Sequence, residues 1–159
     1  MDCTDHLGEP VITVNRATEA DLIDWARMRL ALWPKSSFEK HEADIAAALA
    51  GASEGLNLIA RSTDGVPEGF AEASIRHDYV NGTKTSPVAF LEGIYVEPQF
   101  RGTGVARQLV GAIETWARQS GCSELASDAD ITNLVSQQMH EALGFAETQR
   151  VVYFLKVLG

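Results

Sequence analysis

The 159-residue chain lacks the marks of several large protein classes. It has two cysteines, Cys3 and Cys122, whose spacing matches neither a CxxC motif nor a metal site, so two free thiols are expected rather than a disulfide. Its four histidines are scattered without an HExxH motif, which gives a protein-bound metal little support. No apolar run approaches the roughly 18 residues needed to span a bilayer. The N-terminus carries acids where a secretion signal carries Lys or Arg.

Positive charge is also scarce. Thirteen Lys and Arg residues stand against 22 Asp and Glu residues, which gives a formal net charge of −9. Such a protein is a poor partner for nucleic acid, because binding to phosphates needs a surplus of cations. Together these absences predict a soluble, cytoplasmic protein with no nucleic-acid or membrane partner. The negative charge would attract a cationic substrate, although many cytoplasmic proteins are equally acidic.

The pattern of apolar residues predicts one mixed α/β domain at residues 11–159, preceded by an irregular N-terminal extension at residues 1–10. Asn81 and Gly82 indicate a hairpin turn, and Gly93 inside an apolar strand indicates a bulge. No internal repeat or linker divides the chain. Helices are predicted by apolar spacing at 19–33, 38–49, 104–119 and 132–143, and strands at 11–14, 56–62, 68–80, 87–96, 122–126 and 150–157.

A short glycine loop between a strand and a helix carries most of the chemical information. Gly102 and Gly104 let the backbone approach a ligand, the helix that follows begins with free N–H groups, and Arg101 adds a cation. A pyrophosphate would fit such a cradle. The loop is not a P-loop, because no Lys follows Gly104, and it is not a dinucleotide fingerprint, because Arg107 stands at the third glycine position. A helix start built from convenient glycines remains the alternative.

In this context the run from Arg101 through Gly104 to Ala106 resembles the acyl-coenzyme A signature Q/R-x-x-G-x-G/A of the GNAT acyltransferases. Asn133, followed by Ala142-Leu143-Gly144-Phe145, resembles a second motif of that fold. The resemblance implies a mostly antiparallel central sheet, flanked by helices and splayed open at a bulge near Glu92–Gly93, where acetyl-CoA binds. The implied coenzyme site comprises Ile94, Val96, Arg101, Gly102, Thr103, Gly104, Val105, Ala106 and Asn133.

Residues 32–34, 73–82, 90–94 and 126–128 resemble the aminoglycoside 6′-N-acetyltransferases, and the likeness extends over about residues 14–154. This resemblance implies transfer of acetyl from acetyl-CoA to the 6′-amine of aminoglycosides, and hence antibiotic resistance. Aminoglycosides are polycations, so their site needs carboxylates for the ammonium groups and aromatic side chains beside the sugar rings. The resemblance gives substrate-binding roles to Trp33, Tyr79, Glu92 and Asp128, and Asp78 completes the set.

Simpler explanations remain for some of these side chains. Trp33 can be a core residue at the end of its helix, Tyr79 an ordinary strand aromatic, and Asp78 a solvated turn residue.

The reacting amine must lose a proton before it attacks a thioester. Glu92 is the candidate base, directly or through water, because an unpaired carboxylate among apolar neighbours would be costly without a function. Asp128 shares that task or holds the amine in line, and a backbone N–H near residues 94–96 polarises the carbonyl. We expect direct transfer, because neither cysteine lies in the coenzyme motif.

Many GNAT enzymes place a tyrosine seven residues after the helix asparagine, where it protonates the leaving thiolate. This chain has His140 there, which can serve as that acid or simply pack. Asn133 can bond the pantetheine or merely begin its helix.

Two other functions remain open. One is acetylation of another cationic amine, such as a polyamine, a peptide N-terminus or a lysine, and the other is non-catalytic sensing of acyl-CoA. Similar proteins are often dimers, and the apolar run at 150–157 offers a strand for pairing or exchange between two copies.

Overall fold

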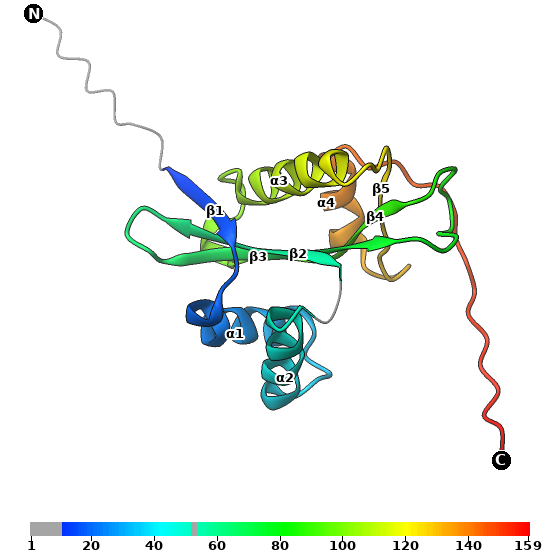
Figure 1. The fold of residues 1–159 in the computed structure, drawn as a ribbon, viewed down its shortest axis with the longest axis horizontal. Coiled ribbons are helices and arrows are strands. Elements are labelled where there is room, and N and C mark those ends of the chain that lie inside the picture. Colours follow the sequence, from blue (N-terminus) through cyan, green and yellow to red (C-terminus); the bar gives the residue numbers. More distant parts are fainter. Residues whose placement is uncertain (1–10, 52–53) are drawn as a thin grey trace, which may run out of the picture.

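The computed structural model describes residues 11–51 and 54–159 (Figure 1). The predicted extension at residues 1–10, including Cys3, lies outside the described residues. Five strands form one sheet in the order β1-β2-β3-β4-β5, with α1 and α2 on one face and α3 and α4 on the other. The predicted mixed α/β architecture is confirmed.

The sheet opens between its last two strands. β1 (Ile12–Arg16), β2 (Gly55–Ser62), β3 (Pro67–Arg76) and β4 (Val88–Val96) are antiparallel neighbours, whereas β5 (Leu125–Ser127) runs parallel to β4. The pairing of β4 with β3 continues as far as Val96, but its pairing with β5 covers only Ala89–Leu91. Within the described residues, one edge of β4 therefore has no strand partner after Leu91.

The predicted bulge is confirmed at the same place. Glu72 of β3 pairs with Gly93, and the next residue, Ala73, pairs with Leu91. Glu92 is thus the additional residue on β4. A bulge of this kind re-aims its side chain and bends the strand.

The four main helices lie where apolar spacing predicts them. They are α1 (Leu22–Leu32), α2 (Phe38–Leu49), α3 (Val105–Gln119) and α4 (Leu134–Ala142), and short 3-10 helices occupy Glu19–Asp21 and Pro98–Phe100. Asp21 accepts a hydrogen bond from the backbone N–H of Thr18 at 2.8 Å, which forms a capping box at the start of the first 3-10 helix. The Oγ of Ser37 accepts from the N–H of Lys40 at 3.1 Å and begins α2.

Each face of the sheet carries its own apolar core. Leu109 and Ile113 of α3 are fully buried against Leu58 and Leu91 of the sheet. On the other face the buried residues are Trp25, Met28, Ile45, Ile59 and Phe70, from α1, α2 and the sheet. Because successive strand residues point to opposite faces, Leu58 and Ile59 belong to different cores.

The predicted strand at 150–157 is wrong. Residues 145–159 form neither helix nor strand, and the segment from residue 150 onward, which we call the tail, extends away from the body (Figure 1). The side chains of Phe154 and Leu155 are 92% and 90% exposed. High β-propensity forms a strand only beside a partner, and the described chain offers the tail none.

Two other strand boundaries also differ from the prediction. The strand predicted at 122–126 begins at Leu125, and the one predicted at 68–80 ends at Arg76, before the turn at Asn81–Gly82. In the described part of the chain, no helix is both long and apolar enough to cross a membrane.

Candidate active site

Two carboxylates predicted to bind the substrate, Glu92 and Asp128, lie side by side in the strand register where the sheet opens. In the parallel register Leu91 of β4 pairs with Ser127 of β5, so the residues that follow, Glu92 and Asp128, both lie where the strands part. The Oγ of Ser127 bonds the carbonyl oxygen of Leu91 at 3.2 Å. Asp128 is exposed at this opening. The arrangement offers two negative charges to a cationic ligand.

The expectation that Glu92 is an unpaired carboxylate in an apolar setting is wrong. Its side chain is 36% exposed and lies beside Ser74 and Arg76 of β3. Oε1 accepts from the Oγ of Ser74 at 2.5 Å, and Nη2 of Arg76 lies 2.9 Å from Oε1 and 3.0 Å from Oε2. The bulge is the physical reason, because the additional residue brings Glu92 to the polar side chains of the neighbouring strand.

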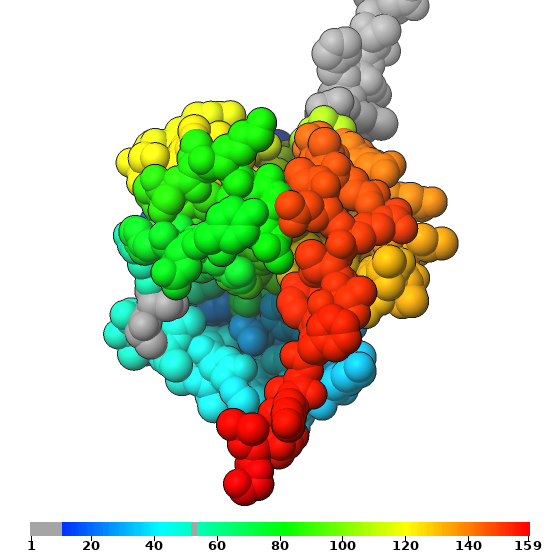
Figure 2. Space-filling view, turned by 90° about the vertical axis from the view of Figure 1, so that its right-hand side faces the viewer, coloured from blue at the N-terminus to red at the C-terminus, as the bar shows by residue number. Residues whose placement is uncertain are grey.

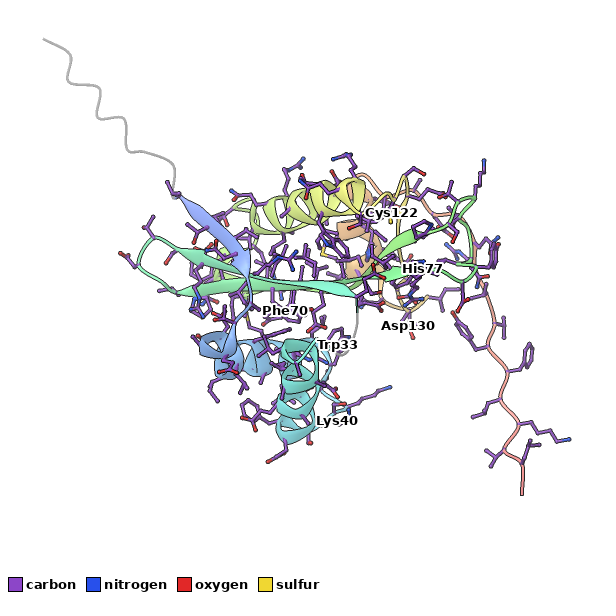
Figure 3. All side chains as sticks on the ribbon, in the orientation of Figure 1. Trp33, Lys40, Phe70, His77, Cys122 and Asp130 are labelled. Carbon is purple, nitrogen blue, oxygen red and sulfur yellow. The ribbon has the colours of Figure 1, made fainter. Side chains whose placement is uncertain are left out.

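Trp33 packs directly against this bulge. A Cβ atom built on Gly93 would lie 2.4 Å from Cζ2 of Trp33, so the indole ring fills the space that a side chain would need. Figure 3 shows Trp33 beside Phe70 on the α1 and α2 side of the sheet, and their ring centroids are 6.1 Å apart. Trp33 is half-buried and therefore both a core residue and a boundary of the opening.

A buried polar network, not foreseen from the sequence, holds Trp33 in place. His41 Nε2 lies 3.1 Å from the carbonyl oxygen of Trp33, and its Nδ1 accepts from Nε of Arg29 at 3.2 Å. Nη1 of Arg29 donates in turn to Oε1 of Glu72 at 2.5 Å, as does Nε1 of Trp25 at 2.8 Å. The guanidinium carbon of Arg29 also lies 4.9 Å from the centroid of the Trp33 ring.

Burial raises the pKa of Glu72, against the opposing effects of the charge on Arg29 and the hydrogen bond from Trp25. The sequence carried a signal for this cluster: Trp25 and Arg29 are four residues apart on α1, and Glu72 alternates with Ser74 on β3.

The glycine loop has the geometry of an anion cradle. Gly102 and Gly104 have φ angles of 78° and 94°, in the left-handed region that favours glycine, and Gly104 is the N-cap of α3. A Cβ on either glycine meets no atom within 4 Å, so the surface above the loop is open. Nε of Arg101 donates to the carbonyl oxygen of Val96 at 3.0 Å, which holds the guanidinium at the end of β4 beside the ring of Tyr95.

The other residues predicted to bind the coenzyme are either buried in the core or hold the glycine loop together. Ile94 and Val105 are 7% and 1% exposed, so they can face a ligand through their backbone but not through their side chains. The hydroxyl of Thr103 donates to the carbonyl oxygen of Phe100 at 2.5 Å and closes the loop. Ala106 is half-buried against the core under α3.

Asn133 begins α4 by accepting a hydrogen bond from the N–H of Ser136 at 3.0 Å, which is its alternative role. His140 lies near the C-terminal end of α4, and both of its ring nitrogens contact other groups of the protein. Nδ1 lies 2.7 Å from the carbonyl oxygen of Ser136, and Nε2 lies 2.8 Å from the Oγ of Ser127. Through Ser127, His140 reaches the level of the opening.

A cavity of about 990 Å³ lies beside β5, between the turn after β3, α4 and the start of the tail. Among the predicted site residues, Tyr79, Asp128 and His140 line this cavity, whereas Trp33, Asp78, Glu92 and the glycine loop do not. Tyr79 is 75% exposed. Figure 2 shows the face with the tail, which runs past a hollow between α2 and the end of the β3–β4 hairpin.

Within residues 11–51 and 54–159, no group of three or more His, Cys, Asp or Glu side chains could hold a metal ion. Cys122 is a buried free thiol on the α3 side of the sheet (Figure 3).

Residues 20–145 match the model of the acetyltransferase (GNAT) family. An aminoglycoside N(6′)-acetyltransferase type 1 from Serratia marcescens is 52% identical over 135 residues, which are 85% of this chain and 92% of the relative. The crystal structure of an aminoglycoside antibiotic 6′-N-acetyltransferase from Acinetobacter baumannii superposes with a TM-score of 0.89 at 45% identity, over 94% of this chain and 100% of that one. AAC(6′)-Iy in complex with the bisubstrate analogue CoA-S-monomethyl-acetylneamine superposes with a TM-score of 0.86 at 45% identity, over 93% and 99% of the two chains.

Proposed function

The chain belongs to the GNAT acetyltransferase family, and we propose that it transfers the acetyl group of acetyl-CoA to the 6′-amine of aminoglycoside antibiotics, which confers resistance to them. The observation that carries this proposal is an identity of 45% to 52% with aminoglycoside 6′-N-acetyltransferases over most of the chain. The complex of AAC(6′)-Iy with an analogue that joins CoA to an acetylneamine adds support from a relative with the same fold.

Acetyl-CoA supplies the acetyl group as a thioester. In our proposal the N–H groups at the start of α3, together with Arg101, bind its pyrophosphate, because they combine unpaired donors with positive charge. The open edge of β4 at residues 94–96 offers backbone donors and acceptors to the pantetheine. An N–H of the same edge polarises the carbonyl oxygen of the thioester.

The acceptor amine meets carboxylates and aromatic rings. Asp128 and Glu92 attract the ammonium groups of the drug, and Asp128, which is exposed at the opening, takes a proton from the 6′-amine directly or through water. Glu92 shares this task once Arg76 no longer covers its oxygens. Trp33 and Tyr79 bound the sugar rings. A proton from His140 would reach the leaving sulfur by way of the Ser127 hydroxyl.

The activity test uses a matched pair of drugs. Neomycin carries an amine at the 6′ position, and paromomycin carries a hydroxyl there. We expect release of CoA thiol with neomycin and none with paromomycin. Turnover of spermidine or peptides without turnover of any 6′-amino aminoglycoside would contradict the proposal. Calorimetric binding of acetyl-CoA without a product from any amine would instead indicate an acyl-CoA sensor.

We also propose that the enzyme is a cytoplasmic homodimer in which the tail of each copy adds to the sheet of the other. Val152, Tyr153, Phe154 and Leu155 are 78% to 92% exposed, which is unusual for a contiguous apolar segment. β5 is an edge strand beside the cavity, and an unpaired edge accepts a further strand. The buried free thiol of Cys122 suits a reducing compartment.

A further inference from the structure

Arg76 of β3 already binds Glu92, a carboxylate that we propose binds the substrate. Its Nη2 atom lies 2.9 Å and 3.0 Å from the two oxygens of Glu92. Its guanidinium carbon lies 3.5 Å from the centroid of the Phe90 ring, so the positive charge also stacks on an aromatic face. Ser74 donates to Glu92 from the other side. An internal cation is thus held between a carboxylate and an aromatic ring.

The same combination of groups recognises an ammonium ion. Ammonium groups bind carboxylates by charge and hydrogen bonding, and aromatic faces by cation–π attraction. Arg76 and Phe90 line the cavity that Tyr79 and Asp128 also line. Glu92 does not line this cavity, so a substrate ammonium inside it faces the guanidinium of Arg76 instead of the carboxylate, and like charges repel.

We propose that Arg76 is a specificity-determining residue: it competes with the substrate ammonium groups for Glu92, so that polycations displace it and amines with a single charge do not. This inference rests on the proposed aminoglycoside acetyltransferase activity. It applies to the selection of the acceptor amine and leaves coenzyme binding unaffected.

The contact is weak enough to be displaced. A single nitrogen of Arg76 approaches both oxygens of Glu92, instead of the two-nitrogen fork that makes arginine–carboxylate pairs strong. The two side chains are 41% and 36% exposed, and an exposed pair favours the closed arrangement by at most about fivefold. A drug with several ammonium groups, one of them on Asp128, supplies enough attraction to replace it.

The test compares Arg76→Gln with the wild-type enzyme. We expect the KM for tobramycin to fall by roughly two- to fivefold in the variant, while kcat and the KM for acetyl-CoA stay within about twofold. The relative decrease in KM should be larger for 6-amino-6-deoxyglucose, which carries one ammonium group. Arg76→Lys keeps the charge but loses the planar face over Phe90, so its KM for tobramycin should lie between those of the wild type and Arg76→Gln. It also provides a second variant if the first folds poorly.

Arg61→Gln is the matched control, because it removes the same charge from a residue that pairs with Asp21 and Asp24 and does not line the cavity. It should leave both KM values unchanged. An unchanged or higher KM for tobramycin in Arg76→Gln, or a tenfold lower kcat, would overturn the inference and make Arg76 a residue that positions Glu92. Absence of wild-type turnover with every 6′-amino aminoglycoside would refute the proposed function itself, so the two failures are distinguishable.

Discussion

Gly104 joins the coenzyme loop to α3 in a conformation that side chains rarely adopt, with a φ of 94°. In Gly104→Val we expect the KM for acetyl-CoA to rise by about tenfold or more, because a strain of about 1–3 kcal/mol acts on the anion cradle. The KM for the aminoglycoside should not change. Steady-state kinetics with each substrate varied in turn measures both.

Gly121→Val provides a control on the same helix. Gly121 follows the C-terminal end of α3, has a φ of 82° and has no atom within 4 Å of a Cβ position, so the backbone strain is similar. Coenzyme affinity should stay normal in that variant. Equal losses in both variants would show that the effect of Gly104→Val is strain alone and not a disturbed binding loop.

A substitution at Glu72 tests the buried polar network that holds Trp33 in place. Glu72→Gln leaves an acceptor for Trp25 but removes one of the two negative partners of Arg29, the other being Asp44 at 3.5 Å, so we expect a loss of about 2 kcal/mol in the free energy of unfolding. Trp33 should lose its fixed position against Gly93, which raises the aminoglycoside KM without changing that for acetyl-CoA. Urea denaturation and kinetics measure the two effects. Normal kinetics in a destabilised variant would show that the network is purely structural.

The sequence predicted these residues unequally. The glycine loop is local in the chain, so the spacing of Gly102 and Gly104 was enough to predict a turn before α3. The pairing of Glu92 with Arg76 depends on the register of two strands at a bulge, and residue types alone do not reveal that contact. The coenzyme-binding, substrate-binding and catalytic roles given to the site residues remain predictions.

Among the elements, the turn between β3 and β4 depends on one carboxylate near β5. Oε1 of Glu124 accepts from the backbone N–H groups of Lys84 and Thr85 at 2.9 Å and 2.7 Å, and from the Thr85 hydroxyl. The hydroxyl bond, followed by the Lys84 N–H, lowers the pKa of Glu124 below its ordinary value of 4.5. This contact ties the hairpin to the chain segment that leads into β5.

A lowered folded-state pKa fixes the sign of the pH dependence. The stabilisation by Glu124 is complete above the unfolded-state value of 4.5 and is lost as the pH falls through the folded-state pKa. Glu124→Gln should therefore melt at a lower temperature than wild type at pH 7, and the two melting temperatures should converge toward pH 3. Melting curves across that range provide the measurement. A difference that persists at pH 3 would assign the effect to lost packing instead of lost charge.

The helices and the turn between β3 and β4 were predictable because apolar periodicity and turn residues are local signals. The end of the chain was not, because a strand at 150–157 needs a partner that these signals do not supply. The short β5 differs for a related reason: Leu125 pairs with Ala89, the second residue of β4, so the residues before Leu125 have almost no strand to pair with.

At the scale of the whole molecule, our proposal makes the tail the segment that joins two copies. Deletion of residues 150–159 should convert a dimer into a monomer, because the exposed Phe154 and Leu155 would no longer reach a second copy. Light scattering after size-exclusion chromatography gives the mass. The double variant Phe154→Asp and Leu155→Asp keeps the full length and should give the same result. A dimer that survives both changes would place the interface elsewhere. The assignment of residues 11–159 to one domain likewise stays a prediction.

The open edge of β4 would also couple the lifetime of the protein to metabolism. Backbone groups after Leu91 have no neighbouring strand in the described chain, and in our proposal they would gain partners when the pantetheine of acetyl-CoA lies along them. A ligand at about 100 times its Kd stabilises the folded state by about 2.7 kcal/mol, and we expect the melting temperature to rise with acetyl-CoA concentration accordingly. Proteases that attack unfolded chains would then spare the enzyme in well-fed cells and remove it in starved ones. Drug resistance based on this fold would in that way decline with the carbon supply of its host.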